Sequence, residues 1–418
     1  MRIALIAAQG QLTSAAQQDG QSAQPVALAR ALAGHGHRVT LYTRRESANC
    51  ARTAILGGGL SVEHIAAGPA RPLPAEHVAR YMPELAAYLS DRWRIKSPDI
   101  VHAFSWTSGL AAIGAVRGTD IPVLQTFESL ASAERRQLRN ADISASRVKL
   151  EAAIGRTVAG VLAASSDEAD ELARLAVPKS AIRIIPAGID TDVFTPDGER
   201  AERGSKSRLV AFAPAGTTRG LESAVRTLTQ LPEAELVIVG GPDTRHLPRT
   251  GPFRDLTQLA TALGVRSRIT FAGDVGQADL AALLRSADVM ISASAYEPDG
   301  TAAIQAMACG TPAVVSAVGG HTDAVVDGIT GLLVAPEHPA MLAHRVRGLL
   351  ARPSLLQAYG IAAADRARSR YAVDRIGQET VAAYERCLRA RSAAVEAVED
   401  ELTGSEAEVD LRQAAAFA

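Results

Sequence analysis

The segment YEPDGTAAIQAMACGTP, residues 296–312, decides the fold because it joins two local patterns. Residues 289–294 before it are apolar in the manner of a buried strand. Proline and small polar residues favour a helix start, so the pattern predicts a helix from about Thr301 to Cys309, ended by Gly310. A strand, a glycine turn and a helix in this order place free N–H groups and the positive end of a helix dipole at one sheet edge, where they can bind an anion. An ordinary buried junction between a strand and a helix would give the same pattern.

Three polar side chains extend this anion site toward a nucleotide sugar. Glu297 precedes the predicted helix, and Thr301 and Gln305 share one of its faces because residues four apart on a helix are neighbours. This layout can place an acid beside a sugar, N–H groups on a phosphate and an amide near a ribose.

The same segment resembles the donor-site signature of family-4 retaining glycosyltransferases. In that signature a glutamate, seven residues and a second glutamate precede Ala-x-Ala-Cys-Gly-x-Pro, and the resemblance continues through residues 318–334 and covers about residues 1–390. It implies the GT-B fold: an α/β protein with two doubly wound Rossmann-like domains facing across a cleft and C-terminal helices that cross back to the N-terminal domain. Two positions differ from the family, since Gln305 replaces the second glutamate and Asp299 replaces the usual aromatic residue.

Composition excludes several classes of protein. The chain has 418 residues, of which 47% are hydrophobic, enough for two or three domains with large cores. A net charge of −1 and an aromatic content of 4% argue against a nucleic-acid partner. Three separated cysteines form neither a disulfide framework nor a metal pattern, which fits a cytoplasmic protein. The apolar residues 1–8 are too few for a signal peptide and are expected to form the first strand, and no segment predicts a membrane span.

Changes in composition predict the domain organisation. The polar residues after 196 mark a boundary between a first domain, residues 1–196, and a second, residues 205–370. The resemblance implies that the first is the acceptor-side domain and the second the donor-binding domain. The resemblance implies that residues 371–392 form a crossover helix. Residues 393–418 are expected to be a flexible acidic tail. The charged segment 134–151 is expected to be a solvated helical region.

Three residues of the first domain are candidates for the acceptor side of the cleft. Gly20 lies in a polar loop after the first strand, for which an ordinary surface loop is an equally good interpretation. His102 lies at a strand end and could face a cleft, although a lone histidine there is more often structural. Glu128 stands where the resembled family has a histidine that contacts the transferred sugar, so we treat it as a candidate catalytic residue. The alternative for Glu128 is a surface ion pair with Arg135 or Arg136.

The resemblance also assigns phosphate contacts in the second domain. Members of the family bind the donor diphosphate with an arginine and a lysine-glycine pair. In this sequence Pro214 stands at the arginine position and Arg219-Gly220 at the lysine-glycine position. The guanidinium of Arg219 suits phosphate oxygens. Gly241 follows the second strand of this domain and is a further candidate for donor binding.

The leading hypothesis is a retaining, metal-independent glycosyltransferase. Glu297, Arg219 and Glu128 would act in catalysis, while Gly220, Gly241, Gly300, Thr301 and Gln305 would bind the donor and Gly20 and His102 the acceptor. The co-substrate would be a nucleotide-diphosphate sugar, with no other cofactor, and the acceptor a small molecule or a glycolipid. The protein would be a monomer or homodimer. The rival hypothesis is a catalytically degenerate relative that acts as a binding or partner subunit, because the departures fall on donor or sugar contacts. An unrelated sugar-nucleotide binder or epimerase is a third alternative.

Overall fold

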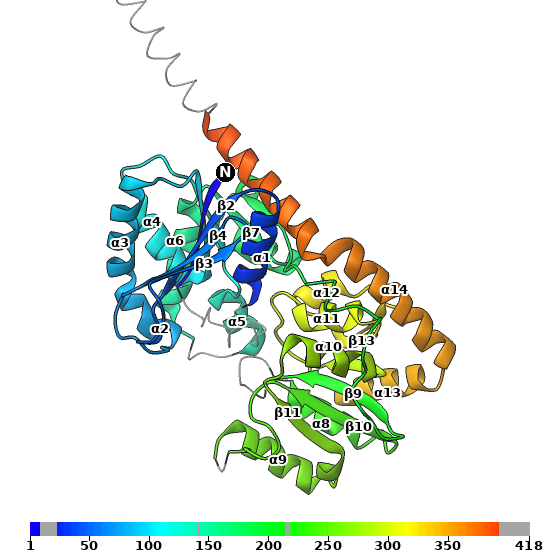
Figure 1. The fold of residues 1–418 in the computed structure, drawn as a ribbon. Coiled ribbons are helices and arrows are strands. Elements are labelled where there is room, and N and C mark those ends of the chain that lie inside the picture. The colour runs from blue at the N-terminus through cyan, green and yellow to red at the C-terminus, as the bar shows by residue number, and fades with distance from the viewer. Residues whose placement is uncertain (9–22, 140–142, 214–217, 219, 249, 393–418) are drawn as a thin grey trace, which may run out of the picture.

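The computed structural model describes residues 1–8, 23–139, 143–213, 218, 220–248 and 250–392. They form two α/β domains, each built on its own sheet, that lie one beside the other (Figure 1). The fold predicted from the sequence, a pair of doubly wound Rossmann-like domains, is confirmed. Residues 197–204, the predicted boundary, lie between the last strand of the first sheet and the first strand of the second.

The N-terminal domain contains an eight-stranded sheet of order β3-β4-β2-β1-β5-β6-β7-β8. All neighbouring strands are parallel except β3 and β4. The central strands are apolar and buried on both faces because helices cover both, as parallel sheets require. The strands are β1 (Arg2–Ala7), β2 (Arg38–Arg44), β3 (Thr53–Gly57), β4 (Leu60–Ile65), β5 (Ile100–Phe104), β6 (Val123–Thr126), β7 (Gly160–Ala163) and β8 (Ile182–Ile184). The helices are α1 (Ala23–Gly34), α2 (Ala75–Val78), η1 (Ala79–Tyr81), α3 (Met82–Ile95), α4 (Ser105–Ala115), α5 (Ala131–Leu138), α6 (Ala145–Thr157), α7 (Ser166–Arg174) and η2 (Lys179–Ala181).

The C-terminal domain contains a six-stranded parallel sheet of order β11-β10-β9-β12-β13-β14. The strand order reverses between β9 and β12, and ligands of such sheets bind beyond the carboxyl ends of the strands near this point. The strands are β9 (Ser207–Phe212), β10 (Ala234–Val239), β11 (Ile269–Gly273), β12 (Val289–Ser292), β13 (Ala313–Ser316) and β14 (Gly331–Val334). The helices are α8 (Leu221–Leu228), α9 (Pro252–Ala262), η4 (Arg266–Arg268), α10 (Gln277–Ser286), α11 (Thr301–Ala308), α12 (Gly320–Ala324), α13 (Pro339–Leu350) and α14 (Pro353–Tyr371).

A last helix, residues 373–392, leaves α14 and returns to the N-terminal domain, as Figure 1 shows in orange and red. Its residues Ala383 and Tyr384 belong to the same apolar cluster as Leu5 and Leu41 of the first sheet. The return passes beside the outgoing linker, where Ile189 pairs with Ala372 in a short parallel bridge. The core of the N-terminal domain is therefore completed by residues from the far end of the chain. The predicted tail, 393–418, lies outside the described residues.

The charged segment 134–151 is helical and, among its described residues, mostly exposed or half-buried, as expected, with one exception. It contributes to two helices, α5 and α6, and the side chain of Glu151 is fully buried. The Glu151 carboxylate accepts hydrogen bonds from the Ala131 amide at 2.8 Å and from Arg147 Nε at 2.7 Å. A buried carboxylate has to be paired in this way, and a charge pattern along the sequence does not show which charged residue will be the buried one.

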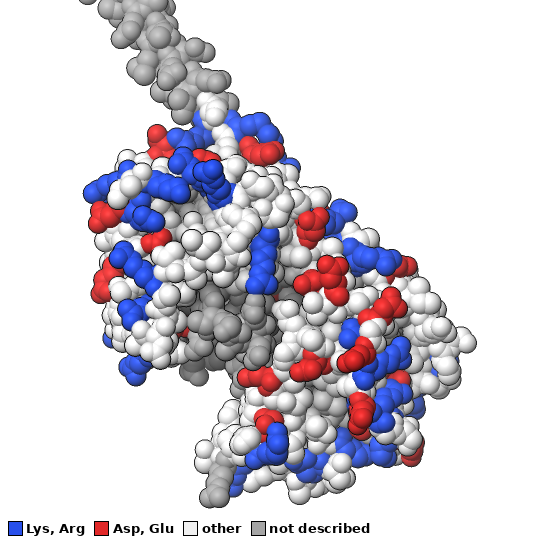
Figure 2. All heavy atoms as spheres, in the orientation of Figure 1, with Lys and Arg blue, Asp and Glu red and all other residues white. Residues whose placement is uncertain are grey.

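The charges on the visible face are mixed rather than segregated. Figure 2 shows basic and acidic side chains interspersed over both domains, without the broad basic patch that a nucleic-acid partner would require. Among the described residues, no helix has the length and apolar character needed to cross a membrane.

Candidate active site

The site is built where β12 ends and α11 begins, at the junction of the two domains. Residues 296–300, here called the 296–300 loop, connect the two elements. The predicted helix from Thr301 is confirmed, and Gly300 before it has a φ of 70°, a left-handed conformation that favours glycine. A Cβ atom on Gly300 would lie 2.9 Å from the carbonyl carbon of Gly320, so the position also needs glycine for space.

A second pair of glycines presses against the 296–300 loop. A Cβ atom on Gly319 would lie 1.8 Å from the backbone oxygen of Glu297, and one on Gly320 would lie 2.2 Å from the carbonyl carbon of Asp299. The Gly320 amide donates a hydrogen bond to the Glu297 carbonyl at 2.9 Å. These contacts fix the position of Glu297. Both glycines belong to the segment 318–334 that resembles the family, but nothing local in the sequence indicates their contact with the 296–300 loop.

Glu297 lies beside a buried histidine. The imidazole of His321 is fully buried, its Nδ1 contacts the Ser316 carbonyl at 3.1 Å, and its Nε2 lies 3.9 Å from Glu297 Oε2. Burial lowers the pKa of His321 to about 4, so the ring is neutral at pH 7 and its Nε2 is an acceptor when Nδ1 donates to the carbonyl. Burial, followed by the charge of Asp299, raises the pKa of Glu297 to about 8.

Asp299 connects the two domains. Its Oδ1 accepts from the Thr301 amide at 2.9 Å, which holds the start of α11, and its Oδ2 accepts from Gln24 Nε2 of the N-terminal domain at 3.0 Å. Gln24 Nε2 also lies 3.4 Å from Thr301 Oγ1. Burial raises the pKa of Asp299 above its ordinary value. Gln24 could not be identified from the sequence, because nothing local relates it to Asp299, 275 positions away.

Two further contacts hold the 296–300 loop to the N-terminal domain. The Leu130 amide donates to the Tyr296 hydroxyl at 3.3 Å, and Ser165 Oγ donates to the Pro298 carbonyl at 3.0 Å. The loop that carries Glu297 is therefore contacted by both domains.

Glu128 follows β6 on the N-terminal side of the junction and has a φ of 63°, unusual for a residue with a side chain. Burial, followed by the charges of Asp299 and Glu168, raises its pKa to about 8. The alternative ion pair with Arg135 or Arg136 is not formed. Arg136 pairs with Glu171 instead, and Arg135 donates to the Ile143 carbonyl.

The raised pKa of Glu128 predicts how stability depends on pH. The folded protein retains this proton up to about pH 8, whereas the unfolded chain releases it near 4.5, so the free energy of unfolding falls as pH rises between these values. Changing Glu128 to Gln removes this loss. We expect the melting temperature of Glu128→Gln to match the wild type at pH 5 and to exceed it at pH 8, by about 2–4 °C for each kcal/mol gained.

Calorimetry at both pH values measures this difference. The matched control is Asp91→Asn, because the Asp91 side chain is 76% exposed and the substitution should shift stability little at either pH. Equal melting temperatures of Glu128→Gln and wild type at pH 8 would contradict the prediction.

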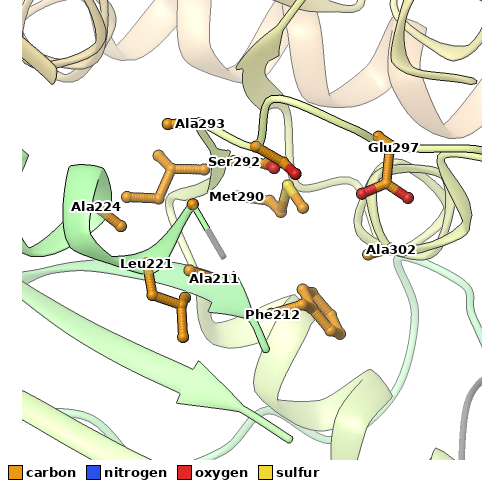
Figure 3. Close-up of a pocket in the computed structure, with 12 residues that line it drawn as sticks. Ala211, Phe212, Leu221, Ala224, Met290, Ser292, Ala293, Glu297 and Ala302 are labelled. Carbon is orange, nitrogen blue, oxygen red and sulfur yellow. The ribbon is translucent and has the colours of Figure 1, made fainter. Parts of the chain in front are cut away.

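A small cavity of about 30 Å³ lies beside Glu297, within the C-terminal domain. Figure 3 shows the Glu297 carboxylate near Ala302 of α11, with the apolar side chains of Phe212, Met290 and Leu221 around the rest of the cavity. Gly220, which precedes α8, also lines it and has a φ of 76°.

The remaining predicted site residues fall in different places. Gly241 follows β10 with a φ of 73°, and a Cβ there would meet the ring of Phe253 at 2.4 Å. Gln305 lies on α11 with a half-buried side chain. Gly20 and Arg219, together with Pro214, lie outside the described residues. Within the described ranges, no group of three or more His, Cys, Asp or Glu side chains is arranged to hold a metal ion.

His102 lies inside the N-terminal domain rather than at its surface. It is 1% exposed, and its ring nitrogens contact the Tyr384 hydroxyl at 2.8 Å and Thr126 Oγ1 at 2.9 Å. Both ring nitrogens have partners within the domain, which favours the structural interpretation of His102. Burial lowers its pKa to about 3.

The contact between His102 and Tyr384 predicts a structural effect. Tyr384→Phe leaves a ring nitrogen of His102 without its partner inside the core, and an unsatisfied buried group typically costs about 1–3 kcal/mol. We expect a lower melting temperature and an unchanged KM for the donor, measured by thermal unfolding and by initial rates. A changed KM with unchanged stability would show that His102 acts at the site after all.

Comparisons with known proteins agree with this arrangement of two domains around an acid and a helix start: the protein is a glycosyltransferase. Residues 19–193 match the family model described as Glycosyltransferase Family 4, and residues 211–366 match the model described as Glycosyl transferases group 1. The D-inositol 3-phosphate glycosyltransferase of Geodermatophilus obscurus is 31% identical over 386 residues, covering 87% of this chain and 84% of that protein. The chain therefore belongs to glycosyltransferase family 4.

A further relative and two solved structures are also similar to this chain. The D-inositol 3-phosphate glycosyltransferase of Actinosynnema mirum is 30% identical over 392 residues, which cover 87% of this chain and 91% of that protein. The structure of a sucrose-phosphate synthase from Thermosynechococcus elongatus matches with a TM-score of 0.83 and 26% identity over 93% of this chain and 99% of that one. Anabaena HepE, solved in complex with UDP-glucose, shares the fold with a TM-score of 0.69 at 17% identity, covering 91% and 98% of the two chains.

Proposed function

We propose that the protein transfers a sugar from a nucleotide-diphosphate sugar to a hydroxyl group of a small-molecule or glycolipid acceptor. Transfer proceeds with retention of configuration and without a metal ion. The observation that carries this proposal is the position of Glu297, which is fixed by Gly319 and Gly320 beside the start of α11. An acid and a helix N-terminus, held together at the domain junction, suit a sugar and a diphosphate respectively.

Each part of the site has a role in this proposal. The free N–H groups at the start of α11 and the guanidinium of Arg219 stabilise the leaving diphosphate as the sugar becomes oxocarbenium-like. Glu297 accepts hydrogen bonds from hydroxyls of the transferred sugar, and Gln305 contacts the ribose as a neutral replacement for a glutamate. Glu128 faces the same site from the N-terminal domain. The anionic diphosphate is neutralised by Arg219 and the helix dipole, so no metal is required.

The relatives support the choice of donor. HepE is solved with UDP-glucose, and the curated relatives are named for glycosyl transfer to D-inositol 3-phosphate. A UDP-sugar is therefore the first donor to test. We further propose that the protein is cytoplasmic. We also propose that it is a monomer or homodimer, and light scattering of the purified chain would measure its oligomeric state.

The test is a panel of UDP-, ADP- and GDP-sugars, with binding measured by calorimetry and hydrolysis or transfer by product formation. We expect one nucleotide to bind at micromolar to millimolar concentration, turnover that survives EDTA, and a product whose anomeric configuration by NMR equals that of the donor. Inversion would overturn the retaining mechanism, and loss of activity in EDTA would overturn metal independence. Absence of any nucleotide binding at millimolar concentration would favour the binding or partner subunit.

A further inference from the structure

Four carboxylates meet at the domain junction. Glu128 and Glu168 belong to the N-terminal domain, and Glu297 and Asp299 belong to the 296–300 loop. Ser165 Oγ accepts from the Glu168 amide at 3.3 Å and donates to the Pro298 carbonyl at 3.0 Å, which places Glu168 against the 296–300 loop. Burial, followed by other causes that include the charge of Asp299, raises the pKa of Glu128, Glu168 and Glu297. Among the residues that the structure describes, none of the four forms an ion pair with an arginine or lysine.

A buried group that is not a carboxylate also points toward this cluster. His321 Nε2 is fully buried, has no hydrogen-bond partner among the described residues and lies 3.9 Å from Glu297 Oε2. Because Nδ1 faces the Ser316 carbonyl at 3.1 Å, the neutral ring presents Nε2 as an acceptor. A buried acceptor of this kind costs free energy unless a donor reaches it, so its direction toward Glu297 indicates a ligand with donors.

The vacant positions around the junction are acceptors as well. Glu168 is 7% exposed, its Oε2 accepts from the Ala164 amide at 2.7 Å, and its Oε1 has no partner among the described residues. Asp299 is already satisfied by Gln24 and by Thr301. Glu128 forms no hydrogen bond within the described part of the chain. A ligand that fits these vacancies supplies hydrogen-bond donors, and a positive charge on it would favour the ionised forms of Glu128 and Glu297, which burial otherwise keeps protonated up to about pH 8.

An ammonium group has these properties, because it carries three N–H donors, no acceptor and one positive charge. A bound metal is a poorer fit, since the described residues include no group of three or more side chains placed to coordinate one. The phosphate of an acceptor, such as the one in the named relatives, would lie beside Glu128 and Glu168 rather than at the start of α11, and these acids, once ionised, would repel it.

We propose that this end of the site binds the ammonium group of an amino sugar or an aminocyclitol. The inference rests on the proposed glycosyl transfer and specifies its substrate class. The ammonium group enters either on the acceptor or on the transferred sugar, since both meet between Glu128 and Glu297.

The acceptor arm of the test uses an amino-inositol, its N-acetylated form, inositol and inositol 3-phosphate, each with the nucleotide sugar that supports turnover. The donor arm compares UDP-glucosamine with UDP-N-acetylglucosamine and UDP-glucose at a fixed neutral acceptor. N-acetylation retains the ring and removes the charge, so it isolates the ammonium group. We expect the free amine to exceed both its acetylated and its hydroxyl counterparts by at least about 10-fold in kcat/KM in one arm.

Variants show whether the carboxylates cause this preference. Glu128→Gln should reduce the ratio of amine to acetylated substrate to about 3-fold or less, and Asp91→Asn, on the exposed face of α3, should leave the ratio unchanged. Equal kcat/KM for amine and acetylated substrates in both arms, or a preference for inositol 3-phosphate, would overturn the inference while glycosyl transfer stands. If no donor supports turnover, calorimetry can compare the binding of amino-inositol and UDP-glucosamine with that of their acetylated forms. Tighter binding of an amine supports the inference and equal binding overturns it, whether or not the protein is active.

Discussion

Glu297→Gln is expected to lower kcat/KM for glycosyl transfer by about 100-fold. Above pH 8, where Glu297 with its pKa of about 8 is ionised, it is a charged acceptor, and a hydrogen bond to such an acceptor contributes about 1.5–3 kcal/mol. Each 1.36 kcal/mol corresponds to about tenfold in rate, so the rates are compared above pH 8. The substitution retains the shape of the side chain, but the carboxylate that accepts from sugar hydroxyls is replaced by a neutral amide. Initial rates with the preferred nucleotide sugar measure the loss.

The same variant should fold normally, which separates catalysis from stability. A glutamine amide can donate toward His321 Nε2, 3.9 Å from the present carboxyl oxygen, and it avoids the cost of a buried acid whose pKa is about 8. Its melting temperature at pH 8 should therefore equal or exceed that of the wild type. Glu222→Gln, a change at an exposed residue of α8, serves as control. A Glu297→Gln enzyme with full activity would show that Glu297 does not contact the reacting sugar.

Gly319→Ala should have the second largest effect, on stability and activity together. Gly319 has a φ of 47°, and a Cβ would lie 1.8 Å from the Glu297 carbonyl oxygen, so the backbone of one loop has to move. Backbone strain of about 1–3 kcal/mol and overpacking of about 1–3 kcal/mol both apply. We expect a melting temperature lower by at least about 4 °C and a loss of most transfer activity.

A matched glycine distinguishes this effect from a general response to substitution. Gly348 lies in α13 with nothing within 4 Å of the position that a Cβ would occupy. Gly348→Ala should therefore be neutral or more stable by up to about 1 kcal/mol, because alanine favours helix. If Gly319→Ala melts at the same temperature as Gly348→Ala, the close packing of the two loops is not important for stability.

The elements whose signals are local could be predicted from the sequence. The apolar strand before residue 296 and the glycine at position 300 predict the start of α11, and the alternation of strands and helices predicts two Rossmann-like domains. These features depend on residues within a few turns of each other. The roles assigned to Glu297, Arg219 and Gln305 remain predictions.

What could not be predicted depends on residues that are distant along the chain. His102 forms a hydrogen bond with Tyr384, 282 positions later, and Asp299 accepts a hydrogen bond from Gln24, 275 positions earlier. The raised pKa of Glu128 comes from burial and from Asp299 across the domain junction, which no spacing within one domain reveals. Glu151 belongs to the same charged segment as the exposed Arg136 and Lys149, and only the packing of α5 on α6 decides that it is buried.

The return of residues 373–392 to the first sheet restricts how this enzyme can be recombined with its relatives. A chimera that takes its C-terminal half from another family member by a single splice after residue 196 would also replace Tyr384, and with it the partner of His102. Two splices, the second close to Ala372, keep that helix with the sheet it completes. We therefore expect that donor preference can be transferred between relatives by exchanging the segment between these two splices, and not by exchanging everything after residue 196.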